Sequence, residues 1–193
     1  MKKFKANDNK NEEHEINYRQ FNKKLELLNQ ILSLISDINQ ASDEKEVKGC
    51  IPALLQYTGE YTDADRVYIF ELMSEKQDYY SNTFEWCREG IVPQIDNLIR
   101  ISANSMPVWH EKFLRGETII IHDLEKICET MPSEYDILKV QDIHSLLVLP
   151  LFANTQLSGF IGLDNPELVN PGVSISLLSN AGGHLASTLN NLR

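Results

Sequence analysis

Apolar residues between positions 145 and 166 fall into two runs, SLLVLPLF and LSGFIGL, which are separated by a short polar turn. Each run has the length of a strand and the turn has hairpin chemistry, so the pattern predicts an antiparallel β-hairpin. Leu147, Leu149 and Leu151 alternate with residues that are also apolar. Because no polar face is left for water, the hairpin is expected in the middle of a sheet that is covered on both sides.

The same patterning predicts the other elements. Residues 65–73 and 79–87 are apolar runs on either side of a polar loop, which indicates a second hairpin. A strand is expected over 118–122, and helices over 42–61, 132–140 and 172–192. Between them, 88–109 is expected to be an irregular crossover with a short helix at 95–101. This order predicts an α+β fold in which a mainly antiparallel sheet of about five or six strands has long N- and C-terminal helices on one face and short helices and loops on the other.

The N-terminal region divides at about residue 14. Residues 1–14 are polar and charged and are expected to be a disordered tail, 15–42 an N-terminal signalling or dimerisation helix, and 43–193 the globular domain with its C-terminal helix. Apolar residues of the N-terminal helix form two stripes, which together are wider than a surface helix needs. One stripe has Leu25, Leu28, Leu32 and Ile35, and the other has Leu27, Ile31, Leu34 and Ile38. Either the helix lies deep in its own domain, or one stripe pairs with a second copy of the chain.

The composition of the chain narrows the range of expected binding partners. The net charge of −10 opposes binding to nucleic acid or to an anionic membrane, so neither is expected. No segment has the length and apolar character of a membrane span or a signal peptide, and a cytoplasmic location is therefore expected.

The fragments DRVYIFELM, GETIIIHDL and LPLFANTQLSGFIGLDNP resemble a GAF domain, a small-molecule-sensing module of signalling proteins that is related to the PAS domain. Two further fragments, TFEWCREGIVPQIDNL and SEYDILKVQDIHSLLVLPLF, resemble the subset of GAF domains that precedes GGDEF-type diguanylate cyclase modules in bacterial proteins. The resemblance covers residues 44–192 and implies a regulatory domain without catalysis. The partners it implies are a second copy of the chain, a small-molecule ligand and a downstream output module such as a diguanylate cyclase.

The resemblance also implies where a ligand and a second copy would bind. A pocket between the sheet and the crossover would combine large apolar walls with a few polar groups. Its candidate residues are Phe84, Trp86, Arg88, Gln94, Asp96, Leu98, Trp109, Ile121 and Tyr135. The alternative is that the aromatic residues only fill the core, which leaves a ligand-free dimerisation module. Candidate dimer residues lie on the two terminal helices: Leu25, Leu28, Leu32, Ile35, Leu178, Gly182, Leu185 and Leu189.

Candidate chemistry is sparse. Cys50, Cys87 and Cys128 are far apart in sequence and suggest buried, inert thiols rather than a disulfide framework. A thiol redox enzyme of the free methionine sulfoxide reductase type is the less favoured alternative, since the motifs of those reductases are absent. The histidines show neither HxxxH nor HExxH spacing, so no metal site is expected, and no catalytic residue or cofactor is assigned.

Overall fold

The computed structural model describes residues 2–74, 78–168 and 171–192. Its centre is a six-stranded antiparallel sheet with the order β3-β2-β1-β6-β5-β4. The strands are β1 (Arg66–Ser74), β2 (Asp78–Cys87), β3 (Ile101–Ser102), β4 (Ile119–Ile121), β5 (Leu146–Ala153) and β6 (Gln156–Asp164). The helices are α1 (Lys2–Gln40), α2 (Glu44–Thr62), α3 (Pro107–Leu114), α4 (Pro132–Lys139) and α5 (Pro171–Leu192), with 3₁₀ turns at Ala103–Ser105 and Leu124–Ile127. The predicted α+β class is confirmed.

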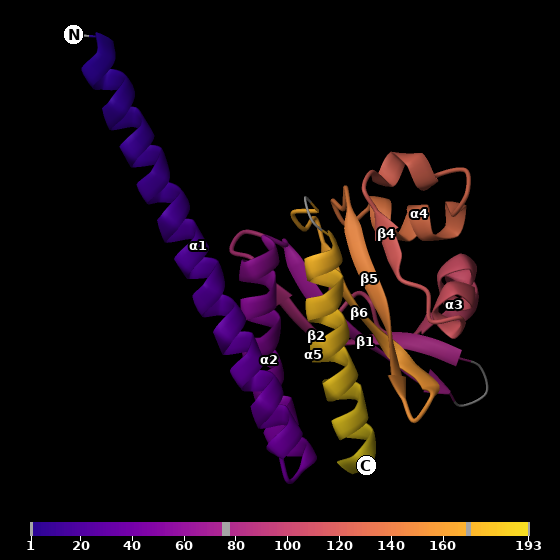
Figure 1. Ribbon diagram of the computed structural model, residues 1–193. Helices are drawn as coiled ribbons and strands as arrows, with labels where there is room; N and C mark the ends of the chain where they lie inside the picture. The colour runs from indigo at the N-terminus through magenta and orange to yellow at the C-terminus, as the bar shows by residue number, and fades with distance from the viewer. Residues whose placement is uncertain (1, 75–77, 169–170, 193) are drawn as a thin grey trace.

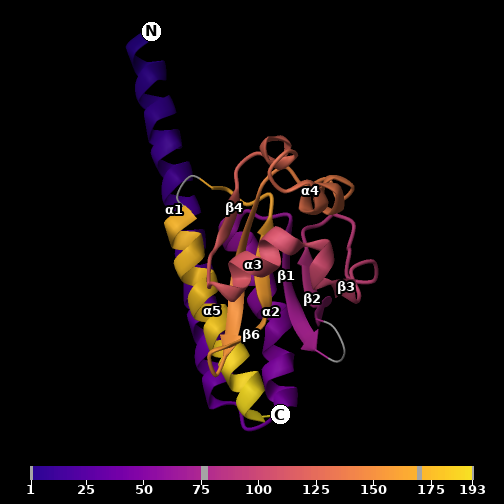
Figure 2. The same cartoon turned by 90° about the vertical axis from the view of Figure 1, so that its right-hand side faces the viewer.

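Helices of two kinds cover the two faces of the sheet. The long helices α1, α2 and α5 form a layer on one face, and α3 and α4 lie on the other (Figures 1 and 2). The hairpin β5–β6 lies between them, as predicted: Leu147, Leu149 and Leu151 point into the core under the long helices, whereas Leu146 and Val148 point into the core under α3 and α4. We call these two cores the helical-layer core and the cavity-side core.

Helix α2 begins with a reciprocal cap. The Asp43 carboxylate accepts a hydrogen bond from the backbone N–H of Glu46 at 2.8 Å, and the Glu46 carboxylate accepts one from the N–H of Ser42 at 2.7 Å. Two N–H groups that the helix cannot satisfy are thereby paired. The helix ends at Asp63, which adopts the left-handed conformation with φ 52°.

Helix α1 extends further than expected. It begins at Lys2 and thus includes the segment predicted to be a disordered tail. Extending an existing helix avoids the cost of nucleation, and the Lys, Glu and Ala residues of this segment are favourable helix formers. The first half of α1 projects beyond the rest of the domain (Figure 1).

The crossover differs from the prediction at 95–101, where no helix forms. A single turn is made instead, in which the N–H groups of Asn97 and Leu98 donate to the carbonyl of Gln94. The Glu85 carboxylate accepts the N–H groups of Gln94 and Ile95, so both are satisfied without a helix. The chain then forms β3 and α3, neither of which was predicted.

Candidate functional site

An irregularity in β2 decides which of its side chains face the site. Asn82 pairs with Phe70 and Phe84 pairs with Ile69, so Thr83 is an extra residue in the ladder. One inserted residue reverses the alternation of side chains beyond it. Tyr80 therefore lies in the cavity-side core, whereas Phe84 packs against the helical-layer core on the opposite face.

This reversal corrects the expected placement of Phe84 and Trp86. Both share one face of β2, as expected, but that face lies against the long helices. The ring of Trp86 fits against Gly59 of α2 so closely that a Cβ atom at Gly59 would lie 2.0 Å from it. Neither side chain lines the cavity. Glu85, which lies between them in sequence, lines it instead.

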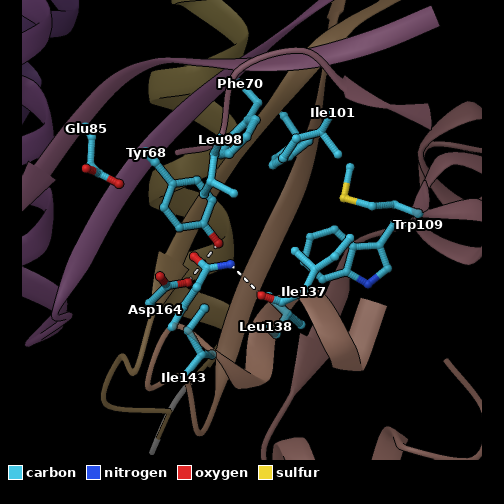
Figure 3. A pocket seen from close by; sticks show the side chains of 13 residues that line it. Tyr68, Phe70, Glu85, Leu98, Ile101, Trp109, Ile137, Leu138, Ile143 and Asp164 are labelled. Atoms are coloured by element: carbon cyan, nitrogen blue, oxygen red, sulfur yellow. Dashed lines mark hydrogen bonds between the residues drawn. The ribbon is translucent and has the colours of Figure 1, made fainter. Parts of the chain in front are cut away.

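The cavity lies between the sheet, the crossover and α4 (Figure 3). Its volume of about 30 Å³ leaves room for about one water molecule. Most of its wall is apolar, and includes Phe70, Leu98, Ile101, Trp109, Ile137 and Phe160. A larger ligand therefore requires the crossover or α4, which cover the cavity, to move.

One end of the cavity is polar. The Tyr68 hydroxyl donates to Oδ1 of Asp164 at 2.9 Å, and Oδ2 of Asp164 lies 3.0 Å from Nε of Arg66. This N–H does not point at the carboxylate, so the contact is an ion pair rather than a directed hydrogen bond. Asp164 is 1% exposed. Burial raises the pKa of Asp164 to about 7, because the loss of hydration outweighs the attraction of Arg66 and the hydrogen bond from Tyr68.

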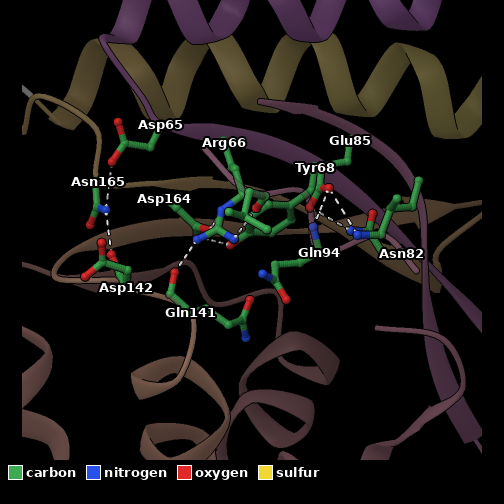
Figure 4. A network of polar contacts seen from close by, with 12 residues as sticks. Asp65, Arg66, Tyr68, Asn82, Glu85, Gln94, Gln141, Asp142, Asp164 and Asn165 are labelled. Atoms are coloured by element: carbon green, nitrogen blue, oxygen red, sulfur yellow. Dashed lines mark hydrogen bonds and ion pairs between the residues drawn. The ribbon is translucent and has the colours of Figure 1, made fainter. Parts of the chain in front are cut away.

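Arg66 also holds the cover of the cavity. Its guanidinium donates to the carbonyl of Gln141, just after α4, and to the carbonyl of Val92 in the crossover (Figure 4). Glu85 holds the crossover a second time through the N–H groups of Gln94 and Ile95, at 2.8 and 3.1 Å. Two separate segments, the crossover around Val92 and the segment around Gln141 that follows α4, are thus fastened to the sheet by buried or half-buried side chains. We call these two segments the flaps.

The structure has a second, larger hollow near the same residues. It has a volume of about 340 Å³ and is lined by Asp65, Arg66, Gln94, Asp142 and Asn165, among others. Gln141 lines both this hollow and the inner cavity. We call this outer hollow the vestibule.

The remaining candidate pocket residues divide into three groups. Leu98 and Trp109 line the inner cavity, as expected. Ile121 and Tyr135 lie in the cavity-side core but not in the cavity wall. The polar candidates lie further out, and they are Gln94 in the vestibule, Arg88 beside Asp63 and Asp65, and Asp96 exposed to solvent.

Sequence reasoning missed the polar end of the cavity, formed by Arg66, Tyr68, Glu85, Gln141 and Asp164. A signal was present in part. Arg66 and Asp164 are charged residues at the ends of two mainly apolar strands, and in the structure they are directly paired across β1 and β6. Buried charges of opposite sign that face each other in a sheet are a common sign of a functional or structural ion pair.

The candidate dimer residues are divided between surface and core. Leu25 and Leu32 are 46% and 53% exposed, and Leu28 is half-buried. The other five residues are used inside the chain: Ile35, Leu178, Leu185 and Leu189 are in the helical-layer core, and Gly182 lies against Leu151.

The three cysteines are free thiols. Burial, with the nearby Glu85 carboxylate, raises the pKa of Cys87 to about 12. Burial also raises the pKa of Cys50. Both shifts disfavour the thiolate that a nucleophilic cysteine needs. Cys128 is exposed. In the described part of the chain, no three His, Cys, Asp or Glu side chains are grouped so that they could hold a metal ion.

The chain belongs to the GAF-domain family, whose model matches residues 48–174. It is 34% identical over 140 residues to the methanogenesis regulatory histidine kinase FilI of Methanothrix harundinacea (strain 6Ac). That match covers 68% of this chain but only 15% of the kinase.

Solved structures show the same fold at low sequence identity. The far-red absorbing dark state of JSC1_58120g3 with bound biliverdin has a TM-score of 0.67 at 15% identity, covering 84% of this chain and 98% of that one. The GAF domain of an Acinetobacter phosphoenolpyruvate-protein phosphotransferase has a TM-score of 0.63 at 14% identity, covering 85% and 92%. Among the described residues, no helix has the length and apolar character needed to cross a bilayer.

Proposed function

We propose that this domain is the sensory part of a signalling protein and that a small molecule bound in the inner cavity is its signal. The observation that carries this proposal is a cavity with a buried polar end, covered by two flaps that Arg66 fastens to the sheet. A ligand that holds the flaps differently shifts the population of domain conformations, because it binds one conformation better than another.

Strand β6 connects the cavity to the long helices. Phe160 and Asp164 line the cavity, while Ile161 and Leu163, between them in sequence, point into the helical-layer core that includes Leu178 of α5. A displacement of β6 by a ligand therefore reaches the packing of α5 across the thickness of one strand. Helices α1 and α5 would carry the change to an output module.

The test is retention of a small molecule by the intact chain. Native mass spectrometry of the freshly purified protein should show an added small mass that heating releases, and the variant Leu98→Phe should lose it, because the larger ring occupies the cavity. Asp96→Asn, an exposed change on the same crossover, should retain it. An added mass that is equally present in Leu98→Phe would contradict binding in this cavity.

A second copy of the chain is the proposed partner of α1. Tyr18, Phe21, Leu25, Leu28 and Leu32 follow the alternating three- and four-residue spacing of a coiled-coil seam. Tyr18 and Phe21 are 66% and 65% exposed. The residues that flank the seam on its open side, Asn22, Asn29 and Ser36, are uncharged, so two copies meet there without like-charge repulsion despite the acidic chain. Since α5 is used within the domain, α1 alone is proposed as the interface.

Sedimentation equilibrium tests this pairing. The wild-type chain should be a dimer at micromolar concentration, and the double variant Leu25→Glu and Leu32→Glu should be a monomer, because it places charges in an apolar seam. Gln30→Glu, on the exposed back of the same helix, should remain a dimer. Monomeric wild type, or a double variant that still dimerises, would refute the interface.

For the output we propose a signalling enzyme that the domain regulates. The 34% identical relative is a histidine kinase, which favours a kinase output over the diguanylate cyclase that the subset resemblance implied. The domain itself is proposed to act without catalysis, as the raised pKa values of Cys50 and Cys87 suit inert thiols better than a reductase. Slow alkylation of both thiols in the native protein is expected, and rapid reaction of Cys87 would reopen the reductase alternative.

A ligand-free dimerisation module is the second candidate. The observation in its favour is the volume of the inner cavity, about 30 Å³, which side chains nearly fill. It is distinguished from the sensor by the mass measurement above, since both candidates predict a dimer.

A further inference from the structure

The ionisable side chains that line the inner cavity, among the described residues, are Tyr68, Glu85 and Asp164. Both carboxylates lie at the polar end, and Trp109 lies at the opposite end (Figure 3). Arg66 is paired with Asp164, but none of the described residues forms an ion pair with Glu85, which is bound only by neutral N–H donors. The polar end thus has two acidic groups and one basic group.

The vestibule has the same excess of acid. Asp65 and Asp142 line it, and the basic residue in its wall is Arg66, the residue shared with the polar end of the cavity. Arg88 stands near Asp65, at 3.7 Å, and is 43% exposed. An excess of one sign of charge around a site attracts ligands of the opposite sign and raises their local concentration.

The apolar end suits the body of such a ligand. Phe70, Trp109 and Phe160 are buried aromatic side chains in the cavity wall. Aromatic faces attract cations as well as apolar groups. The indole N–H of Trp109 has no hydrogen-bond partner among the described residues, although the side chain is 3% exposed. The indole N–H of Trp109 is therefore a buried donor that a bound molecule can pair.

Resting on the proposed sensory function, we infer that the ligand is a small organic cation: a protonated amine or a related group near Glu85 and Asp164, on a compact apolar or aromatic body that extends toward Trp109. The charge is the specific part of this inference. A carboxylate ligand of the same shape would meet Glu85 and Asp164 at the polar end, where like charges repel strongly because little water screens them.

Three probes that share one body and differ in their head group test the inference. They are 2-phenylethylamine, 2-phenylethanol and 3-phenylpropionate, compared by calorimetry at about pH 8, where the alkylamine is protonated. We expect the amine to bind about ten-fold more tightly than the alcohol, and the carboxylate more weakly still.

Location is read from the two tryptophans of the chain. With ¹⁵N-labelled indole groups, the signal of Trp109 in the cavity wall should shift on binding, and the signal of Trp86 on the opposite face of the sheet should stay in place. Each assignment follows from the loss of one signal in Trp109→Phe or Trp86→Phe.

Two charge variants form a matched pair. Glu85→Gln removes the unpaired charge but keeps an oxygen for the N–H groups of the crossover, and it should reduce the preference for amine over alcohol from about ten-fold to about two-fold. Asp96→Asn makes the same change on the exposed side of the crossover and should leave the preference as it is.

The outcomes separate the two proposals. If the alcohol or the carboxylate binds as tightly as the amine while the Trp109 signal shifts, the cation inference is wrong and the sensory cavity stands. If none of the three probes shifts the Trp109 signal, the inference fails, while the search for a retained mass still decides the sensory function. A shift of the Trp86 signal alone would place binding elsewhere and overturn the inference.

Discussion

The two faces of one sheet differ in chemistry, although the same strands supply both. In β1, Val67 and Ile69 point into the helical-layer core, and Tyr68 and Phe70 point into the cavity-side core. The helical-layer core consists mainly of aliphatic residues on three long helices. The cavity-side core contains the buried Arg66–Asp164 pair at its edge and an unfilled volume. A single layer of backbone therefore separates a supporting face from a face that can respond to a ligand.

Aromatic packing makes the cavity-side core different again. Phe160 is at its centre: its ring stacks on Phe70 at 4.6 Å between centroids and also contacts Tyr80, Trp109 and Phe113. We therefore expect the aliphatic core under the long helices to contribute more to stability than the core that holds the cavity.

The largest expected effect is on stability, and truncation of one leucine in each core tests the difference between the two faces. Leu178→Ala, in the helical-layer core at 0% exposure, should lower the free energy of unfolding by about 2–5 kcal/mol. Leu98→Ala, half-buried in a flap beside an existing cavity, should cost less than about 1.5 kcal/mol. Urea unfolding followed by circular dichroism measures both. Equal losses would mean that the two faces do not differ in this way.

The next effect concerns the buried carboxyl group of the cavity side. Asp164 has a pKa of about 7 in the folded state, above its value in the unfolded chain, so the folded state retains a proton that the unfolded state loses. The retained proton stabilises the folded state. This contribution to the free energy of unfolding is fully present below about pH 4 and is lost as the pH rises through 7, with a slope of roughly 1 kcal/mol per pH unit.

Unfolding curves from about pH 4 to 8 for wild type and Asp164→Asn measure this contribution. Arg66, Tyr68 and Glu85 face Asp164 and are present in both proteins, so a slope that is found only in wild type belongs to Asp164. The variant should show a flatter curve. Identical slopes would show that Asp164 stays ionised beside Arg66 throughout this range.

The smallest effects come from two adjacent glycines of α5. A Cβ atom at Gly182 would lie 2.5 Å from Leu151 of β5, whereas a Cβ atom at Gly183 would meet nothing within 4 Å. Gly182→Ala should therefore destabilise the domain by about 1–3 kcal/mol through overpacking. Gly183→Ala should stabilise it by about 0.5–1 kcal/mol, because alanine is the better helix former. Thermal unfolding of the pair gives the two signs, and the same sign in both would contradict the close contact of α5 with the sheet.

Much of the fold could be predicted because the signals were local. The hairpin of residues 145–166 and its two buried faces are confirmed, and so are the second hairpin and the helices expected over 42–61, 132–140 and 172–192. Each rests on an apolar run, a turn or a helical period of 3.6 residues that can be read within one segment. The helix expected at 95–101 was wrong: the chain makes a single turn at Gln94, and Arg100 adopts a left-handed conformation with φ 56°, which a continuous α-helix does not allow.

The site was less predictable, since it depends on which face each side chain takes. Leu98 and Trp109 were identified, but Phe84 and Trp86 were expected on the cavity side and lie under the long helices. The extra residue at Thr83 causes this, and it is visible only as a shift in the pairing of β2 with β1. Strand register is a property of two segments together, so neither segment reveals it alone.

By itself, the sequence determined the class of fold, the family and the presence of two buried faces, because apolar periodicity and turn residues act within short segments. Only the tertiary structure decided which face holds the cavity, that Arg66 fastens two distant flaps, and that the polar end has an excess of acid. These features bring together residues such as Arg66, Gln141 and Asp164 from three separate elements. Their chemistry arises from burial and mutual distance, which the chain acquires only when it packs.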